Sequence, residues 1–196
     1  MKRESKHYAF PRRRGDNITL IGMPGSGKST LGYIAAKELK RPFVDTDDVL
    51  CEMTGTADTG ELSAKTDFQG FVAYEEEAVL SLRRKKHIIA TGGSVVYSPR
   101  AMRHLQKLGS VIYIQVPLEV IEKRVGSLTE RGVILAPGQS MADLYRTRHR
   151  LYKRYADIEF IPAELNVRTS GTLLAAMITY LEGERKRNYE QAHRSY

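Results

Sequence analysis

Short apolar runs alternate with stretches of helical periodicity between residues 17 and 182. The apolar runs have the length of buried strands, and they lie at residues 17–21, 41–45, 87–91, 111–116 and 158–160. Between them, apolar positions recur every three or four residues, which predicts helices over residues 29–39, 68–84, 98–107, 118–125, 140–155 and 171–182. This alternation predicts an α/β fold, a three-layer sandwich in which a parallel sheet of about five strands is flanked by helices.

One internal segment stands outside this alternation. Residues 126–139 show no clear period and contain three glycines and a proline, so we expect a mobile connection there. Ser140 followed by Asp143 resembles a capping box, which marks the start of the next helix.

The charge of the chain is concentrated at its two ends. The 196 residues carry a net charge of +8, of which +4 lies in residues 1–16 and +2 in residues 183–196. We therefore expect two basic tails on either side of one domain over residues 17–182. Solvated tails explain this charge, so a nucleic-acid partner is not expected, although contact with RNA or an acidic partner remains the alternative.

The remaining composition indicates the setting of the protein. Cys51 is the single cysteine, which fits a reducing compartment. No apolar run approaches the roughly 20 residues that cross a membrane, and no signal core follows the polar start of the chain. We expect a cytoplasmic protein without membrane association, either a monomer or a weak homodimer.

A phosphate-binding motif follows the first predicted strand. Gly22–Ser29 match the pattern G-x-x-x-x-G-K-[ST], between a strand and a helix as the chemistry requires. Glycines let the backbone approach phosphate oxygens, which the start of the next helix also attracts. Lys28 would contact the outer phosphates of a nucleotide, and the Ser29 hydroxyl would bind Mg²⁺. The residues expected to hold the nucleotide are Gly25, Ser26, Gly27, Lys28, Ser29 and Thr30.

Carboxylates follow the second predicted strand. Asp45 and Asp47 lie two residues apart, so an extended backbone would place both on one side. Such a pair could hold water on Mg²⁺ and accept a hydrogen bond from an attacking hydroxyl. The alternative, equally compatible with the spacing, is that these residues and Asp48 cap the following helix.

With the phosphate loop, Asp45-Thr-Asp47 and Thr91-Gly92-Gly93, the chain resembles the shikimate kinase family from about residue 17 to residue 155. The resemblance implies transfer of the γ-phosphoryl group of ATP to a hydroxyl of shikimate, a small hydroxylated metabolite, with Mg²⁺. It also implies a five-stranded parallel sheet, a substrate region at about residues 46–75, and a lid at about residues 126–139 that closes over ATP.

The resemblance also assigns roles to single residues. Lys28 and Ser29 match the phosphate and metal residues, Asp45 the carboxylate near the metal, and Asp47 the carboxylate that contacts the substrate hydroxyls and acts as a base. Gly92 and Gly93 match backbone that meets the substrate ring. The matched arginines are Arg124 along the adenine, Arg131 in the lid and Arg148 on the substrate carboxylate. Each arginine could instead be a solvated residue on an outer helix face.

Departures from the family pattern gather where the substrate is recognised. Val72 stands where the family has a carboxylate-binding arginine, and Glu75, which would steady that arginine, is left without its evident partner. Ser94 replaces the third glycine of the loop, and Gly132 replaces the lid proline.

Three further functions remain compatible with these residues. The protein could phosphorylate a different small hydroxylated acceptor, because phosphoryl transfer depends mainly on positioning and charge. It could be a nucleotide-binding regulator that has lost turnover. It could also be a P-loop protein acting on nucleic acid, for which the basic tails are the only indication.

Overall fold

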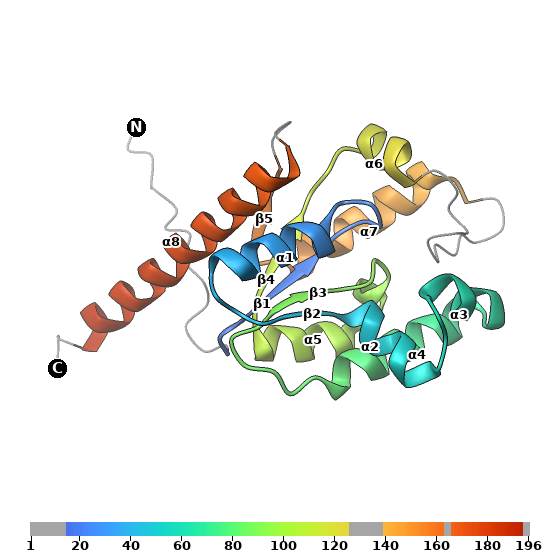
Figure 1. Ribbon diagram of the computed structural model, residues 1–196, viewed down its shortest axis with the longest axis horizontal. Helices are drawn as coiled ribbons and strands as arrows, with labels where there is room; N and C mark the ends of the chain where they lie inside the picture. Colours follow the sequence, from blue (N-terminus) through green and yellow to red (C-terminus); the bar gives the residue numbers. More distant parts are fainter. Residues whose placement is uncertain (1–14, 126–138, 163–165, 194–196) are drawn as a thin grey trace.

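The computed structural model describes residues 15–125, 139–162 and 166–193. A parallel sheet of five strands, in the order β2-β3-β1-β4-β5, forms its centre (Figure 1). The strands are β1 (Asn17–Ile21), β2 (Phe43–Asp45), β3 (Ile88–Ala90), β4 (Gly109–Ile114) and β5 (Ile158–Phe160). The predicted fold class and its strand number are therefore confirmed.

Helices cover both faces of this sheet. They are α1 (Lys28–Glu38), α2 (Thr46–Thr54), α3 (Thr59–Lys65), α4 (Phe68–Ser81), α5 (Pro99–Leu108), α6 (Leu118–Val125), α7 (Met141–Tyr155) and α8 (Val167–His193), with a 3₁₀ turn at Val95–Tyr97. Figure 1 shows α1 and α8 together on one side of the sheet and α5 with α4 on the other. The three-layer arrangement follows from strands that are apolar on both faces.

The three central strands form the middle of the hydrophobic core. Every residue of β1, β3 and β4 is buried, and Leu20, Ile89 and Ile112 have no exposed surface. Leu20 lies between Ala90 on β3 and Ile112 on β4 in the register of the sheet. Because β1 has β3 on one side and β4 on the other, the sheet has its topological switch point there, where ligands of open α/β sheets bind.

The segment between β2 and α4 carries helices that the periodicity did not indicate. The Asp45 side chain accepts a hydrogen bond from Asp47 N at 3.1 Å and caps α2, and the Asp58 side chain caps α3. The prediction of extended backbone over residues 45–47 is therefore wrong beyond Asp45, because α2 begins at Thr46. The alternative, that Asp45 caps the following helix, is confirmed. Both short helices lie within the expected substrate region.

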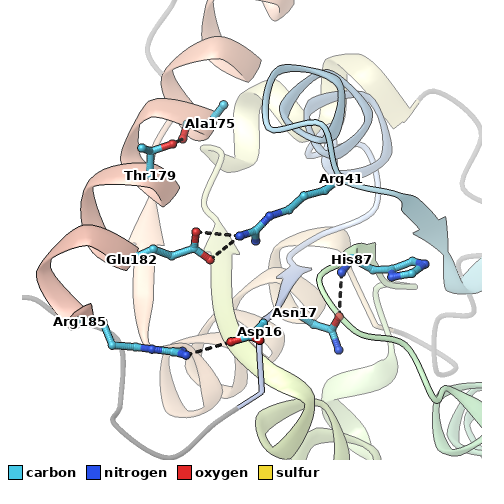
Figure 2. A network of polar contacts seen from close by, with 8 residues as sticks. All are labelled: Asp16, Asn17, Arg41, His87, Ala175, Thr179, Glu182 and Arg185. Carbon is cyan, nitrogen blue, oxygen red and sulfur yellow. Dashed lines mark hydrogen bonds and ion pairs between the residues drawn. The ribbon is translucent and has the colours of Figure 1, made fainter. Parts of the chain in front are cut away.

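The last helix is longer than the sequence indicated. It was expected at residues 171–182, but α8 begins at Val167 and ends at His193, within the expected basic tail. Two ion pairs hold its middle part against the domain: Arg41 with Glu182, and Arg185 with Asp16 (Figure 2). The capping box of α7, by contrast, is present as predicted.

No helix within the three described ranges is long and apolar enough to span a membrane.

Candidate active site

The phosphate loop forms the turn between β1 and α1. Gly25 (φ 76°) and Gly27 (φ 88°) adopt left-handed backbone conformations, and Gly27 is the residue that precedes α1. An L side chain rarely adopts this geometry, which explains glycine at both positions. The first amides of α1 have no partner within the helix, so they are available to phosphate oxygens.

Lys28 is held inside the site. Its side chain is buried, and Nζ donates a hydrogen bond to Met23 O, a carbonyl of the phosphate loop, at 2.9 Å. Burial lowers the pKa of Lys28, while the nearby carboxylates of Asp47 and Asp45 raise it. The ammonium group therefore lies at the start of α1, close enough to Asp47 and Asp45 for their charges to act on it.

Asp45 and Asp47 differ in their surroundings. Asp47 lines a cavity next to the phosphate loop, whereas Asp45 is not among the described residues of the cavity wall. Burial, followed by the charge of Asp45, raises the pKa of Asp47 to about 6, and Lys28 opposes this shift. Asp47 is therefore the carboxylate of this pair that a ligand in the cavity can meet.

Two glycines after β3 allow side chains from other elements to pack closely against the backbone there. A Cβ atom at Gly92 would lie 2.0 Å from Glu75 Oε1 and 2.9 Å from Asp47 Oδ1. A Cβ atom at Gly93 would lie 2.7 Å from Pro24 Cδ in the phosphate loop and 3.1 Å from an Arg148 Nη atom. Any side chain at these two positions would displace its neighbours, so backbone alone forms this part of the wall.

Arg148 enters the same cavity from α7. Only 2% of its surface is exposed, its guanidinium carbon lies 5.3 Å from the centre of the Tyr97 ring, and Nε has no hydrogen-bond partner. Within the described part of the chain, no carboxylate oxygen lies within 4.0 Å of its guanidinium nitrogens. A buried cation that forms no close ion pair is costly, which makes this position suited to an anionic ligand.

Glu75 has a partner that the sequence did not indicate. It is 4% exposed, and its Oε2 atom accepts a hydrogen bond from the Ser94 hydroxyl at 2.5 Å. Burial raises the pKa of Glu75 to about 7, and the hydrogen bond from Ser94 opposes the rise. Ser94 and Val72 both depart from the family pattern. These two departures are the feature of the sequence that could have indicated a new partner for Glu75.

The remaining expected nucleotide residues also line the cavity. Ser29 and Thr30 line it at the exposed start of α1. Arg124, on α6, also lines it, and its Nη1 atom lies 3.4 Å from Gly25 O. Arg131 and residues 126–138 of the expected lid lie outside the described residues.

Together these residues enclose a cavity of about 1140 Å³. Its wall includes the phosphate loop together with Asp47, Glu75, Gly92 and Arg148. That volume exceeds the usual size of a pocket for one small ligand. The arrangement can therefore hold a nucleotide and a second small molecule side by side.

Comparison with known proteins identifies the family. The family model for shikimate kinase matches residues 24–181. Shikimate kinase from Legionella pneumophila (strain Corby) is 34% identical over 171 residues, which cover 86% of this chain and 95% of that protein. Threonine synthase-like 1 from Homo sapiens is 34% identical over 142 residues, 72% of this chain but 19% of that protein.

A solved structure agrees with the sequence comparisons. Shikimate kinase from Acinetobacter baumannii in complex with shikimate superposes with a TM-score of 0.76 at 27% identity, covering 86% of this chain and 95% of that one. Fold, phosphate loop and sequence similarity therefore agree, and this chain belongs to the shikimate kinase family.

Proposed function

We propose that this protein transfers the γ-phosphoryl group of ATP to a hydroxyl group of shikimate, giving ADP and shikimate 3-phosphate. The observation that carries the proposal is that one cavity is lined by the phosphate loop together with Asp47 and Arg148. A donor of phosphate at one end and an acceptor hydroxyl at the other would meet between them. Membership of the shikimate kinase family and the likeness to a relative solved with shikimate support this choice of acceptor.

The donor half would consist of the phosphate loop and two arginines. Backbone amides from Gly25 to Thr30 would surround the phosphates, and Lys28 would bridge the outer ones. Arg124 would lie along the adenine, and Arg131 would add positive charge as the transferred group becomes more negative. Lid closure over residues 126–139 would exclude water, which otherwise competes for the phosphoryl group.

The acceptor half would hold shikimate by its carboxylate and its hydroxyls. Arg148, buried without a carboxylate partner in the described part of the chain, would pair with the substrate carboxylate. Backbone at Gly92 and Gly93 would meet the ring. Asp47 would accept the proton of the attacking hydroxyl. The hydroxyl oxygen would bond to the γ-phosphorus while the bond between that phosphorus and the β–γ bridging oxygen breaks.

Mg²⁺ fits the oxygen donors beside the phosphate loop. Among the described residues no group of three or more His, Cys, Asp or Glu side chains forms a metal cage. Mg²⁺ does not require such a cage, because it commonly keeps several waters and is held by substrate phosphates with one or two protein oxygens. The Ser29 hydroxyl would bind it directly, and Asp45, partly engaged in capping α2, would hold one of its waters. When bound, the ion neutralises charge on the phosphates.

A second candidate is the phosphorylation of another small hydroxylated acceptor. The observation that favours it is Val72, which stands where the family pattern has a second carboxylate-binding arginine. An acceptor with a single anionic group or none would still fit a site with Arg148. We also propose that the protein acts in the cytoplasm, as its lone Cys51 suits, and as a monomer or weak homodimer.

Product analysis tests this function. The protein is incubated with ATP, Mg²⁺ and shikimate, and the products are identified by ³¹P NMR, with shikimate omitted in one control and other hydroxy acids and sugars in its place in others. A phosphate ester of shikimate that forms with equimolar ADP supports the proposal. An ester that forms only with another acceptor supports the second candidate instead.

A further inference from the structure

Two carboxylates converge at Gly92 in the wall of the cavity. Asp47 from α2 and Glu75 from α4 both approach Gly92, where a Cβ atom would lie 2.9 Å from Asp47 Oδ1 and 2.0 Å from Glu75 Oε1. The proposed base, Asp47, accounts for one of them. Glu75 lines the same wall, is almost fully buried, and has no role in the proposed reaction so far.

The two oxygens of Glu75 are not equivalent. Oε2 accepts the 2.5 Å hydrogen bond from the Ser94 hydroxyl. Oε1 lies against Gly92 and forms no hydrogen bond with any residue in the described ranges. Among the described residues, Oε1 is not one of the fully buried atoms that lack a partner, so it keeps contact with the space of the cavity and can accept a hydrogen bond from a ligand there.

Helix geometry explains why Ser94 holds Glu75 in this chain. Residues 72 and 75 lie three apart on α4, so their side chains are neighbours on the helix surface. An arginine at position 72 would reach the carboxylate and occupy it. Val72 cannot do so, is half-buried, and is not among the described residues of the cavity wall. The hydroxyl of Ser94 is then the group that orients Glu75.

We propose that Ser94 positions Glu75 to accept a hydrogen bond from a hydroxyl of the phosphoryl acceptor, so that this chain recognises its acceptor with two carboxylates and one arginine. The proposal rests on the proposed function and deepens it. Such a site suits a ring with several hydroxyls and one anionic group. Glu75 would determine specificity through direct contact, and Ser94 would be a positioning residue.

A steady-state assay with shikimate separates these roles. Ser94→Ala removes the hydroxyl that orients Glu75, so we expect the KM for shikimate to rise by roughly three- to ten-fold. The KM for ATP and kcat should stay within about two-fold, because neither the phosphate loop nor Asp47 changes. Glu75→Gln weakens the contact itself, and the KM for shikimate should rise by about ten-fold or more.

The chain offers a matched control. The Ser98 hydroxyl donates to Glu76 Oε2, also at 2.5 Å, yet neither residue lines the cavity. Ser98→Ala removes a hydrogen bond of the same kind, together with the cap of α5, and should lower thermal stability without changing the KM for shikimate.

A double-mutant cycle with Glu75 distinguishes positioning from packing. Because Ser94 acts through Glu75, Ser94→Ala should change the KM for shikimate by less than about two-fold when Glu75 is already replaced by glutamine. The inference is overturned if folded Ser94→Ala keeps the wild-type KM, if it loses kcat instead, or if it raises the KM equally in the wild-type and Glu75→Gln backgrounds. Absence of shikimate phosphorylation by the wild-type protein would overturn the proposed function, and the inference with it.

Discussion

Arg41, which precedes β2, donates two hydrogen bonds from Nη2 to the carboxylate oxygens of Glu182 on α8, at 2.9 and 2.8 Å (Figure 2). Their side chains are only 17% and 31% exposed, so solvent screens the pair weakly. The contact joins the C-terminal helix to the edge of the sheet across 141 residues of sequence. It is therefore a candidate for the interaction that keeps α8 docked.

Glu182→Gln should lower the free energy of unfolding by about 1–2 kcal/mol, because it leaves the partly buried Arg41 charge without its counter-ion. Urea unfolding at pH 7 measures the loss. Glu190→Gln is the control, because Glu190 pairs with Lys186 at 4.0 Å on an exposed part of α8 and should change stability by less than about 0.5 kcal/mol. Equal losses in the two variants would contradict this role of Arg41.

Gly171 marks the close contact between α8 and α1. A Cβ atom there would lie 2.5 Å from Ile34 Cγ2, so Gly171→Val should destabilise the protein by about 1–3 kcal/mol through overpacking. Gly183, on the same helix, has no atom closer than 3.7 Å to its Cβ position, and Gly183→Ala should stabilise by about 0.5–1 kcal/mol through helix propensity. Thermal unfolding of both variants checks these opposite signs; a loss in both would show that α8 tolerates no side chain at either position.

The sequence was sufficient for features that depend on local patterns. Apolar runs located all five strands, and the consecutive residues Gly22–Ser29 defined the phosphate loop, because each signal lies within a few residues. The charged stretch after residue 182 carries no comparable apolar period. Ion pairs between residues three or four apart stabilise the helix there instead, such as Arg187 with Glu184 and Lys186 with Glu190.

Side-chain pairing at the site required the structure. Asp45 caps α2 by accepting from Asp47 N, so the spacing of two residues did not imply an extended strand. Ser94 and Glu75 are 19 residues apart and come from different elements, and only the packing of α4 against the loop after β3 brings them together. The family pattern pairs this glutamate with an arginine at position 72. Because this chain has Val72 there, the resemblance predicted a glutamate without a partner and did not indicate Ser94.

The pKa of Glu75, raised to about 7 chiefly by burial, predicts a pH-dependent contribution to stability. Asp47 raises this pKa further, whereas Ser94, Arg148 and Lys28 lower it. Between the ordinary value near 4.5 and about 7, the folded protein keeps a proton that the unfolded chain has released, so the stability contributed by this group falls as pH rises through that window.

Glu75→Gln abolishes this titration. Relative to wild type, the variant should gain about 2–3 kcal/mol in free energy of unfolding between pH 4.5 and pH 8, measured by urea unfolding. Glu77→Gln, at an exposed position of the same helix, serves as the control. Its free energy of unfolding should differ from that of the wild type by the same amount at every pH in this window. A constant difference for Glu75→Gln as well would show that Glu75 is ionised at its ordinary pKa in the folded protein.

Arg148→Lys should weaken acceptor binding and leave ATP binding intact. Lysine keeps the charge but loses the planar fork that pairs with a carboxylate, so the KM for shikimate should rise by about ten-fold or more. Arg150→Lys, at an exposed position of α7, should leave both KM values unchanged. A rise in the KM for ATP alone would instead place Arg148 on the nucleotide.

Shikimate-dependent ADP release in the Asp47→Asn variant tests the central claim most directly. Asparagine keeps the shape of Asp47 but cannot take the hydroxyl proton, so kcat should fall by about 10²- to 10⁴-fold. Asp48→Asn, which alters the exposed neighbour on α2, should retain wild-type turnover. Wild-type turnover in Asp47→Asn would contradict the account, because the cavity between the phosphate loop and Arg148 would then not contain the base of the reaction.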